Sequence, residues 1–193
     1  MDIQSRRLEY ALVLAQTIQD DLEDAQLLWS KDFPFDLYKS NVKALNAVFN
    51  AMLYAEEMIK ERKLHHPLGL KDECSVDCHL EVEGLYANIS TEFLVANLEG
   101  LTAIVEGTNS GGFRQVLLGV GEEEIADEFE KILDDLITQL EEIEEPLGTL
   151  FETNPDKLDV FQEDLSRLTS LLKWDIATVL EMEIPQQSAG DND

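Results

Sequence analysis

All the histidines and cysteines of this 193-residue chain fall within residues 64–107; they are His65, His66, His79, Cys74 and Cys78. Imidazole nitrogens, thiolates and carboxylates are the usual protein ligands of transition metals, and paired thiols can form disulfides. Most of the remaining sequence is acidic and regularly patterned. We therefore expect any specific chemistry to be concentrated in this stretch.

The two cysteines, which have three residues between them, allow several interpretations. A Cys74–Cys78 disulfide would pin the segment and is typical of an exported protein. A metal site could instead use His66, His79 and Glu81 and hold a divalent or ferric cation, although the spacing matches no standard zinc motif. The order C-x-x-x-C-H, which ends at His79, is one residue longer than the haem-attachment motif. Two reduced thiols are the remaining alternative. Of these, we expect the disulfide.

Other chemical motifs are absent from the sequence. It contains no H-E-x-x-H, no G-x-S-x-G and no phosphate-binding glycine loop. Adjacent carboxylates such as Asp134 and Asp135 fall on polar faces of expected helices, where solvation explains them. A ferritin-like di-iron site needs Glu-x-x-His on inward helix faces, which the position of the histidines excludes.

The net charge of −27 restricts the partners of the chain. Nucleic acids and anionic membranes would be repelled, whereas cations and basic partners would not. No apolar run approaches the ~18 residues of a membrane span, and residues 1–10 lack the apolar core of a signal peptide. The chain is therefore either cytosolic or the product of a longer precursor.

Apolar residues recur every three or four positions in five long segments, which predicts five helices. We expect them at residues 3–29, 37–64, 91–106, 122–145 and 154–182, with a short helical turn at 113–118. Ser90 and Asn154 are expected to cap the third and fifth of them. The apolar stripe of the second helix is Leu45, Val48, Met52, Ala55 and Ile59; that of the fifth is Leu158, Phe161, Leu165, Leu168, Leu172, Ile176 and Val179.

No strand pattern occurs, so the expected fold is all-α. We predict an antiparallel up-and-down bundle of four long helices and one shorter helix. One long, ordered loop would cover residues 65–89, because a connection of this length with many apolar residues should be packed down. The bundle would form a single domain over residues 1–185, followed by a flexible acidic tail over residues 186–193.

From Pro67 onward, features of the sequence follow the order found in the C-terminal half of the imelysin-like family. They are Pro67-Leu68-Gly69-Leu70, then Glu83, Tyr86, Ser90 and Asn97-Leu98-Glu99-Gly100-Leu101, then the glycine-bordered stretch 107–121, and last the ending Gly190-Asp191-Asn192-Asp193. The chain resembles this half over most of its length, and more loosely in its first two helices.

The resemblance implies a periplasmic or cell-envelope protein, because imelysin-like proteins are exported by bacteria and are often linked to iron. Full-length members contain two similar bundles, and their G-x-H-x-x-E motif lies in the first bundle. No histidine here has a glutamate three residues later, so we expect this sequence to be either the second half of a longer protein or a relative with one bundle. The functional positions that the resemblance implies are Glu83, Tyr86, Ser90 and Asn97.

Three functions follow as hypotheses. The first is a non-enzymatic binding module of an envelope protein, used in the uptake of iron or another cation. The second is a metal-dependent hydrolase or peptidase with its site in residues 65–89, and the third is a structural or interaction bundle. The expected partners are a second imelysin-like bundle, another envelope protein, or a second copy in a weak homodimer. This homodimer would cover an apolar patch formed by Leu80, Val82, Leu85 and Tyr86.

Overall fold

The computed structural model describes residues 3–29, 41–71, 74–107 and 111–184, and divides the chain into two compact units, residues 1–45 and 46–193. The described residues are predominantly helical and contain no β-strand, so the all-α prediction is confirmed. In the first unit, α1 (Ile3–Trp29) is one continuous helix without a buried residue. The single domain over residues 1–185 stays a prediction, and the tail at 186–193 lies outside the described residues.

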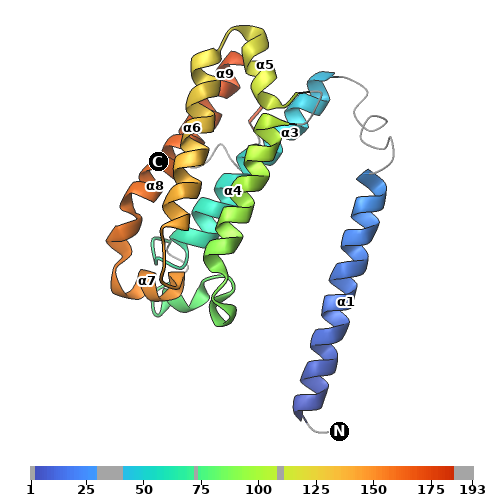
Figure 1. The fold of residues 1–193 in the computed structure, drawn as a ribbon, viewed down its shortest axis with the longest axis vertical. Coiled ribbons are helices and arrows are strands. Elements are labelled where there is room, and N and C mark those ends of the chain that lie inside the picture. The colour runs from blue at the N-terminus through green and yellow to red at the C-terminus, as the bar shows by residue number, and fades with distance from the viewer. Residues whose placement is uncertain (1–2, 30–40, 72–73, 108–110, 185–193) are drawn as a thin grey trace. The chain divides into compact units, whose positions relative to one another are not determined.

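The second unit is an up-and-down helical bundle (Figure 1). Its long elements are α3 (Asn41–Ala55) continued by the π-helix η1 (Glu56–His65), α4 (Ser90–Glu106), α6 (Glu123–Glu141), and α8 (Asp159–Ser170) continued by the π-helix η5 (Leu171–Ile176) and α9 (Ala177–Val179). α6 packs between α4 and α8, and η1 contacts both α4 and α8. The short helix α5 (Phe113–Val120) lies at one end of the bundle and α7 (Leu147–Thr153) at the other.

The apolar periodicity of the sequence correctly identifies most of the core. In α4, the apolar residues Leu94, Leu98, Leu101 and Val105, which recur every three or four positions, are all buried. Of the seven residues predicted for the stripe of the fifth helix, six are buried: Leu158, Phe161, Leu165, Leu168, Leu172 and Ile176. Burial of a leucine-sized side chain contributes about 1.5–3 kcal/mol, so these stripes account for much of the cohesion of the bundle.

The stripe predicted for the second helix is partly wrong. Phe49 is completely buried, whereas the predicted Val48 is 39% exposed. Beyond Ala55, the helix also changes to the wider π form, which alters which side chains face inward. A search for 3.6-residue periodicity cannot detect this change.

The helix α7 and the two helix caps also differ from expectation. The sequence predicts no helix between residues 145 and 154, but α7 begins directly after Pro146, and its residues Leu147, Gly148, Leu150 and Phe151 are buried. A Cβ atom at Gly148 would lie 2.6 Å from Leu85 Cδ1 and 3.3 Å from the carbonyl oxygen of His79. This closeness shows that α7 packs directly on residues of the long loop. Ser90 is the first residue of α4 and not its cap, so that prediction is wrong. Asn154 occupies the predicted N-cap position before Pro155, but its side chain makes no capping hydrogen bond.

Ion pairs hold α5 against α6. Arg114 donates from Nε to Glu130, at 2.8 Å from Oε1, and its Nη2 also pairs with Asp127. The hydrogen bond to Glu130 is the main cause that raises the pKa of Arg114, and partial desolvation opposes it. The guanidinium carries its positive charge beside these two carboxylates, as arginine does in proteins generally.

Candidate functional site

The long loop between η1 and α4 is folded down onto the bundle. It contains two 3₁₀ turns, η2 (Cys78–Glu81) and η3 (Leu85–Ala87), and η2 packs against α7. Cys74 and Cys78 are joined by a disulfide with an S–S distance of 2.04 Å. This bond closes a small ring directly before η2, so the histidine that follows it starts from a constrained backbone.

Each of the three histidines lies beside a carboxylate. His66 Nε2 is 2.5 Å from Glu81 Oε2, which joins the end of η1 to η2. His79 Nε2 is 3.8 Å from an oxygen of Glu152 in α7. His65 Nδ1 is 3.4 Å from the buried Glu61, which also pairs with Lys71. His66 and His79 therefore attach the loop to its neighbours at two places, whereas the contact of His65 with Glu61 lies within η1.

The candidate metal ligands do not converge as a set. Only His66 and Glu81 contact each other, because His79 faces Glu152 instead. In the part of the chain that the structure describes, no three His, Cys, Asp or Glu side chains form a group that could hold a metal ion. His66 and Glu81 together supply two donor atoms, which is fewer than the three protein ligands of a catalytic zinc site.

Lys63 connects two of the four positions implied by the resemblance. Its Nζ lies 2.7 Å from Glu83 Oε2 and 2.5 Å from Asn97 Oδ1, and it stands 5.7 Å from the centre of the Phe93 ring. The Lys63 side chain is only 11% exposed, whereas that of Glu83 is 50% exposed. We call Lys63, Glu83 and Asn97 the Lys63 cluster; it presents a carboxylate and an amide at the surface, joined by an ammonium that is largely covered.

Ser90 and Tyr86 play different parts around this cluster. The Ser90 hydroxyl donates to the backbone carbonyl of Glu83 and thereby fixes the turn that carries the carboxylate. Tyr86 is fully exposed, and no contact ties it to Lys63. Of the four expected positions, three are therefore brought together: two through Lys63 and one through the backbone of Glu83.

An apolar groove of about 280 Å³ adjoins the cluster at Asn97. It runs between α3 with the start of η1 on one side and α4 on the other. Tyr54 and Ile104 border it and are partly exposed, and a Cβ atom at Gly100 would meet no heavy atom within 4 Å. The cluster and the groove together offer a polar end and an apolar body, which is the usual composition of a small-ligand site.

The order of motifs along the chain agrees with a comparison against family models. The model described as Peptidase_M75: Imelysin matches residues 2–173. The chain belongs to the imelysin family. Neither a curated protein nor a solved structure matches this imelysin. Within the described residues, none of its helices is long and apolar enough to cross a membrane.

Sequence reasoning missed Lys63 and the groove of this imelysin. Lys63 lies 34 residues before Asn97, and nothing local in the sequence connects them. The only signal in the sequence was the position of Lys63 in the last helical turn before the loop. A lysine there can reach the expected site residues that the loop carries. The groove depends on Gly100, which lies in the Asn-Leu-x-Gly series and leaves α4 without a side chain at that position.

Proposed function

We propose that this imelysin is a non-enzymatic binding module of a bacterial envelope protein and that the Lys63 cluster with its groove is the ligand site. The observation that carries the proposal is the meeting of Lys63, Glu83 and Asn97 beside an apolar groove. Such a site suits a small zwitterionic ligand with an apolar part: its ammonium would pair with Glu83, its carboxylate with Lys63, and its apolar group would enter the groove.

The bonding of the polar groups favours binding over hydrolysis. A serine nucleophile needs a base within hydrogen-bond reach, and the Ser90 hydroxyl is directed at a backbone carbonyl instead. His66 and His79 each face a glutamate of the loop or of α7. None of these contacts arranges a nucleophile, a base and an orienting group in sequence.

A single probe can test both parts of the proposal. The dipeptide glycyl-phenylalanine carries an ammonium, a carboxylate, an amide and an apolar ring. When it is titrated into ¹⁵N-labelled protein, we expect chemical-shift changes at the amides of Asn97 and Gly100. The same mixtures, incubated with and without zinc, should contain intact dipeptide. Zinc-dependent cleavage that is lost in His79→Ala would establish the competing peptidase hypothesis.

The matched variants are Lys63→Met and Lys131→Met. Both remove one positive charge, but Lys131 lies on α6, where its ammonium pairs with Asp135. Lys63→Met should weaken dipeptide binding by about tenfold, because a buried charged hydrogen bond is worth about 1.5–3 kcal/mol. Lys131→Met should leave it unchanged. If the groove amides show no chemical-shift change, or if both variants lose the same dipeptide affinity, the Lys63 cluster is not the binding site.

A cation is a second candidate ligand, and the 2.5 Å contact between His66 and Glu81 favours it. An imidazole and a carboxylate at hydrogen-bond distance could both bind a divalent or ferric ion, with water completing the coordination. Titration calorimetry with zinc and with ferric citrate should then give weak binding that Glu81→Gln abolishes. Unchanged heats in Glu81→Gln would exclude this pair.

The Cys74–Cys78 bond supports the envelope location, because disulfides persist in oxidising compartments such as the periplasm. A second imelysin-like bundle or another envelope protein is the proposed partner. Fractionation of cells that produce the natural gene product should recover it with periplasmic markers. Recovery with cytoplasmic markers would contradict this location.

A further inference from the structure

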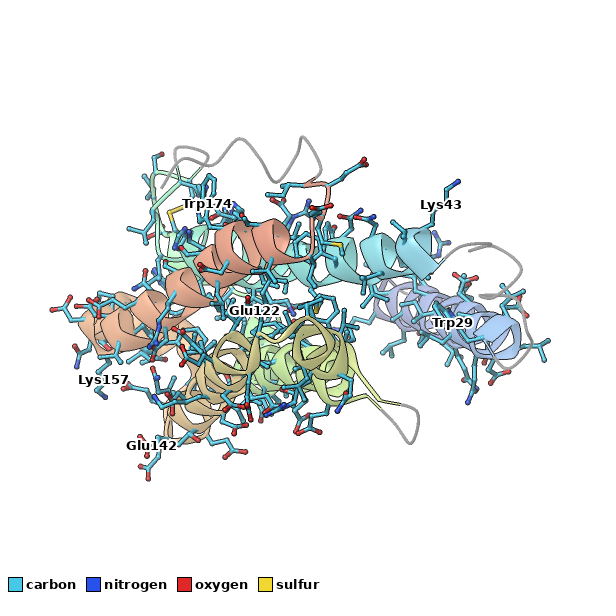
Figure 2. All side chains as sticks on the ribbon, turned by 90° about the horizontal axis from the view of Figure 1, so that it is seen from above. Trp29, Lys43, Glu122, Glu142, Lys157 and Trp174 are labelled. Carbon is cyan, nitrogen blue, oxygen red and sulfur yellow. A yellow bond between two sulfur atoms is a disulfide. The ribbon has the colours of Figure 1, made fainter. Side chains whose placement is uncertain are left out.

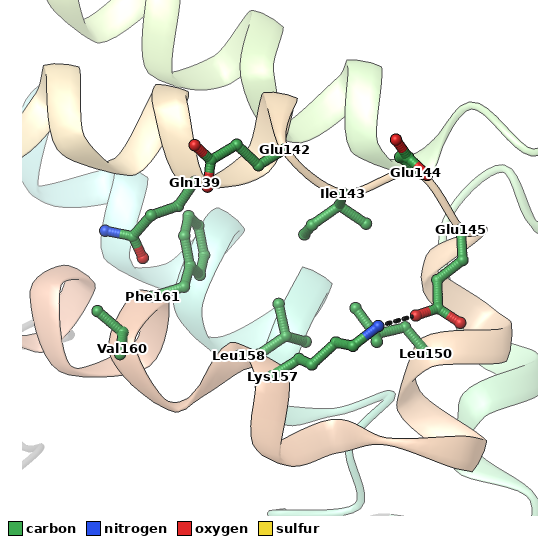
Figure 3. Close-up of a pocket in the computed structure, with 10 residues that line it drawn as sticks. All are labelled: Gln139, Glu142, Ile143, Glu144, Glu145, Leu150, Lys157, Leu158, Val160 and Phe161. Carbon is green, nitrogen blue, oxygen red and sulfur yellow. Dashed lines mark hydrogen bonds and ion pairs between the residues drawn. The ribbon is translucent and has the colours of Figure 1, made fainter.

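A cleft of about 570 Å³ lies at the α7 end of the bundle, and none of its lining residues belongs to the Lys63 cluster (Figure 3). Its floor consists of Leu150, Leu158 and Phe161, which are at most 2% exposed. Its walls come from the end of α6, the segment between α6 and α7, and the start of α8. The floor is apolar and shaped, so the cleft can bury the apolar part of a ligand.

The rim of this cleft is acidic. Glu142, Glu144 and Glu145 line it together with one cation, Lys157. Lys157 Nζ lies 2.6 Å from Glu145 Oε1, and Figure 3 shows the side chain extending along the cleft toward that carboxylate. Glu142 and Lys157 come from different elements, and both lie at the surface, where Figure 2 labels them. Lys157 of the chain itself therefore occupies the cleft with its ammonium on the carboxylate rim, and the lysine of a ligand could bind in the same way.

A second hollow, of about 600 Å³, adjoins the same segment. It shares Glu144 and Glu145 with the first cleft and adds Glu92, Glu99 and Glu141, and among the described residues no basic side chain lines it. We call the two hollows together the double cleft. A ligand that crosses the segment between them would meet carboxylates on both sides, so the geometry favours an elongated ligand with several separated positive charges.

We propose that the double cleft docks a lysine- or arginine-containing peptide segment of a partner protein. A single metal ion does not fit, because the carboxylates of the described residues do not converge on one position. Anionic partners are excluded by the charge of the chain, −27. A peptide with alternating basic and apolar side chains satisfies both the rim and the floor. This inference uses neither Lys63 nor the groove and stands independently of the proposed ligand site.

The test uses a fluorescein-labelled octapeptide of alternating lysine and leucine, followed by fluorescence anisotropy. The double variant Glu142→Gln/Glu144→Gln should weaken binding about fivefold to tenfold, in keeping with the worth of two exposed charge contacts. The control Glu124→Gln/Asp134→Asn removes the same charge from exposed positions earlier on α6 and should change binding less than twofold. Circular dichroism melts will show that both variants are folded.

Two further arms separate docking from general attraction. Lys157→Met removes the resident ammonium and should tighten binding severalfold, whereas Lys131→Met, with the same charge change, should not. An octapeptide of alternating lysine and serine should bind more weakly than the leucine peptide, because it leaves the apolar floor empty. Equal effects in the paired variants, equal affinity of the two peptides, or no binding by the unaltered chain would each overturn the proposal. Displacement by spermine at the concentration of the peptide would assign the cleft to a small polyamine instead, and would also overturn it.

Discussion

Lys173 Nζ lies 2.7 Å from Glu56 Oε2, and the two side chains are only 9% and 7% exposed. The two residues are 117 positions apart, and each belongs to a π-helix: Glu56 begins η1 and Lys173 lies in η5. π-Helical turns are rare and usually have a local cause. Here the two π-helices are joined by a buried ion pair, which fixes the first and last long elements of the bundle against each other.

The first prediction concerns this pair. Lys173→Met or Glu56→Leu alone would leave one buried charge without its partner and should reduce the free energy of unfolding by about 3–5 kcal/mol. The double variant should recover most of that loss, because two apolar side chains can replace a buried pair at little cost. Urea unfolding of the four proteins measures the coupling. Additive losses would show that the pair does not act as a unit.

The second prediction compares the effect on stability of replacing two helical glycines, Gly148 and Gly100, by alanine. Gly148→Ala should destabilise the protein by about 1–3 kcal/mol, because its Cβ would press on Leu85 and on the backbone of His79. Gly100→Ala meets no atom within 4 Å and should stabilise α4 by about 0.5–1 kcal/mol. Thermal melts will decide both signs. Stabilisation by both substitutions would mean that α7 does not pack closely on the loop.

The third prediction concerns the disulfide in the native protein. Thiol counting under denaturing, non-reducing conditions should find no free thiol at Cys74 or Cys78. Closing so short a loop restricts the unfolded chain only modestly, so reduction should lower the free energy of unfolding by about 2 kcal/mol. Two reactive thiols in oxidised, metal-free protein would contradict the predicted bond.

The fourth prediction compares two positions around α8. Leu165→Ala should cost about 2–5 kcal/mol, because Leu165 is 1% exposed. Asn154→Ala should cost less than about 0.5 kcal/mol, because Asn154 makes no side-chain capping bond and its loss is an ordinary surface change. Urea midpoints will rank them. Equal costs would place Leu165 outside the core or restore a capping role to Asn154.

The fifth prediction concerns assembly. Leu80 and Tyr86 are exposed, whereas Val82 is buried beside Gly148, so the apolar patch is smaller than the sequence indicates. We still expect a weak dimer that tightens as salt rises, because salt screens the repulsion between two chains of charge −27. Sedimentation velocity at low and high salt tests it, with Tyr86→Ser as the disrupting variant. A monomer at high micromolar concentration in both buffers would refute it.

Helix positions and most of the core could be predicted because burial repeats with the helical period. The stripe of α4 and that of α8 with η5 follow this rule at nearly every residue. α7 was missed because seven residues after a proline give too few repeats to establish a period. Ser90 has the right type for a cap, but its hydroxyl is captured by the carbonyl of Glu83, which is seven residues earlier.

The candidate site was predictable only as a set of separate positions. The sequence indicates Glu83, Ser90 and Asn97 through their order along the chain, and it places the histidines in the loop. It contains no signal that Lys63 bonds to Glu83 and Asn97, because this meeting depends on how η1 packs against α4. Likewise, His66 and His79 share a loop but face different carboxylates, which spacing alone cannot distinguish.

The π-helical form of η1 and η5 also affects how relatives of this chain should be aligned. The backbone hydrogen bond of a π-helix joins residues i and i+5 and so encloses one residue more than the hydrogen bond of an α-helix. Each π-helical turn can therefore absorb a one-residue insertion without breaking the helix. Relatives with ordinary α-helices here would differ in length by single residues within a continuous helix. A one-residue gap inside residues 56–65 or 171–176 of an alignment would then mark a real change of helical form. If the gap were placed in the nearest loop instead, every buried position between that loop and the π-helix would be misaligned.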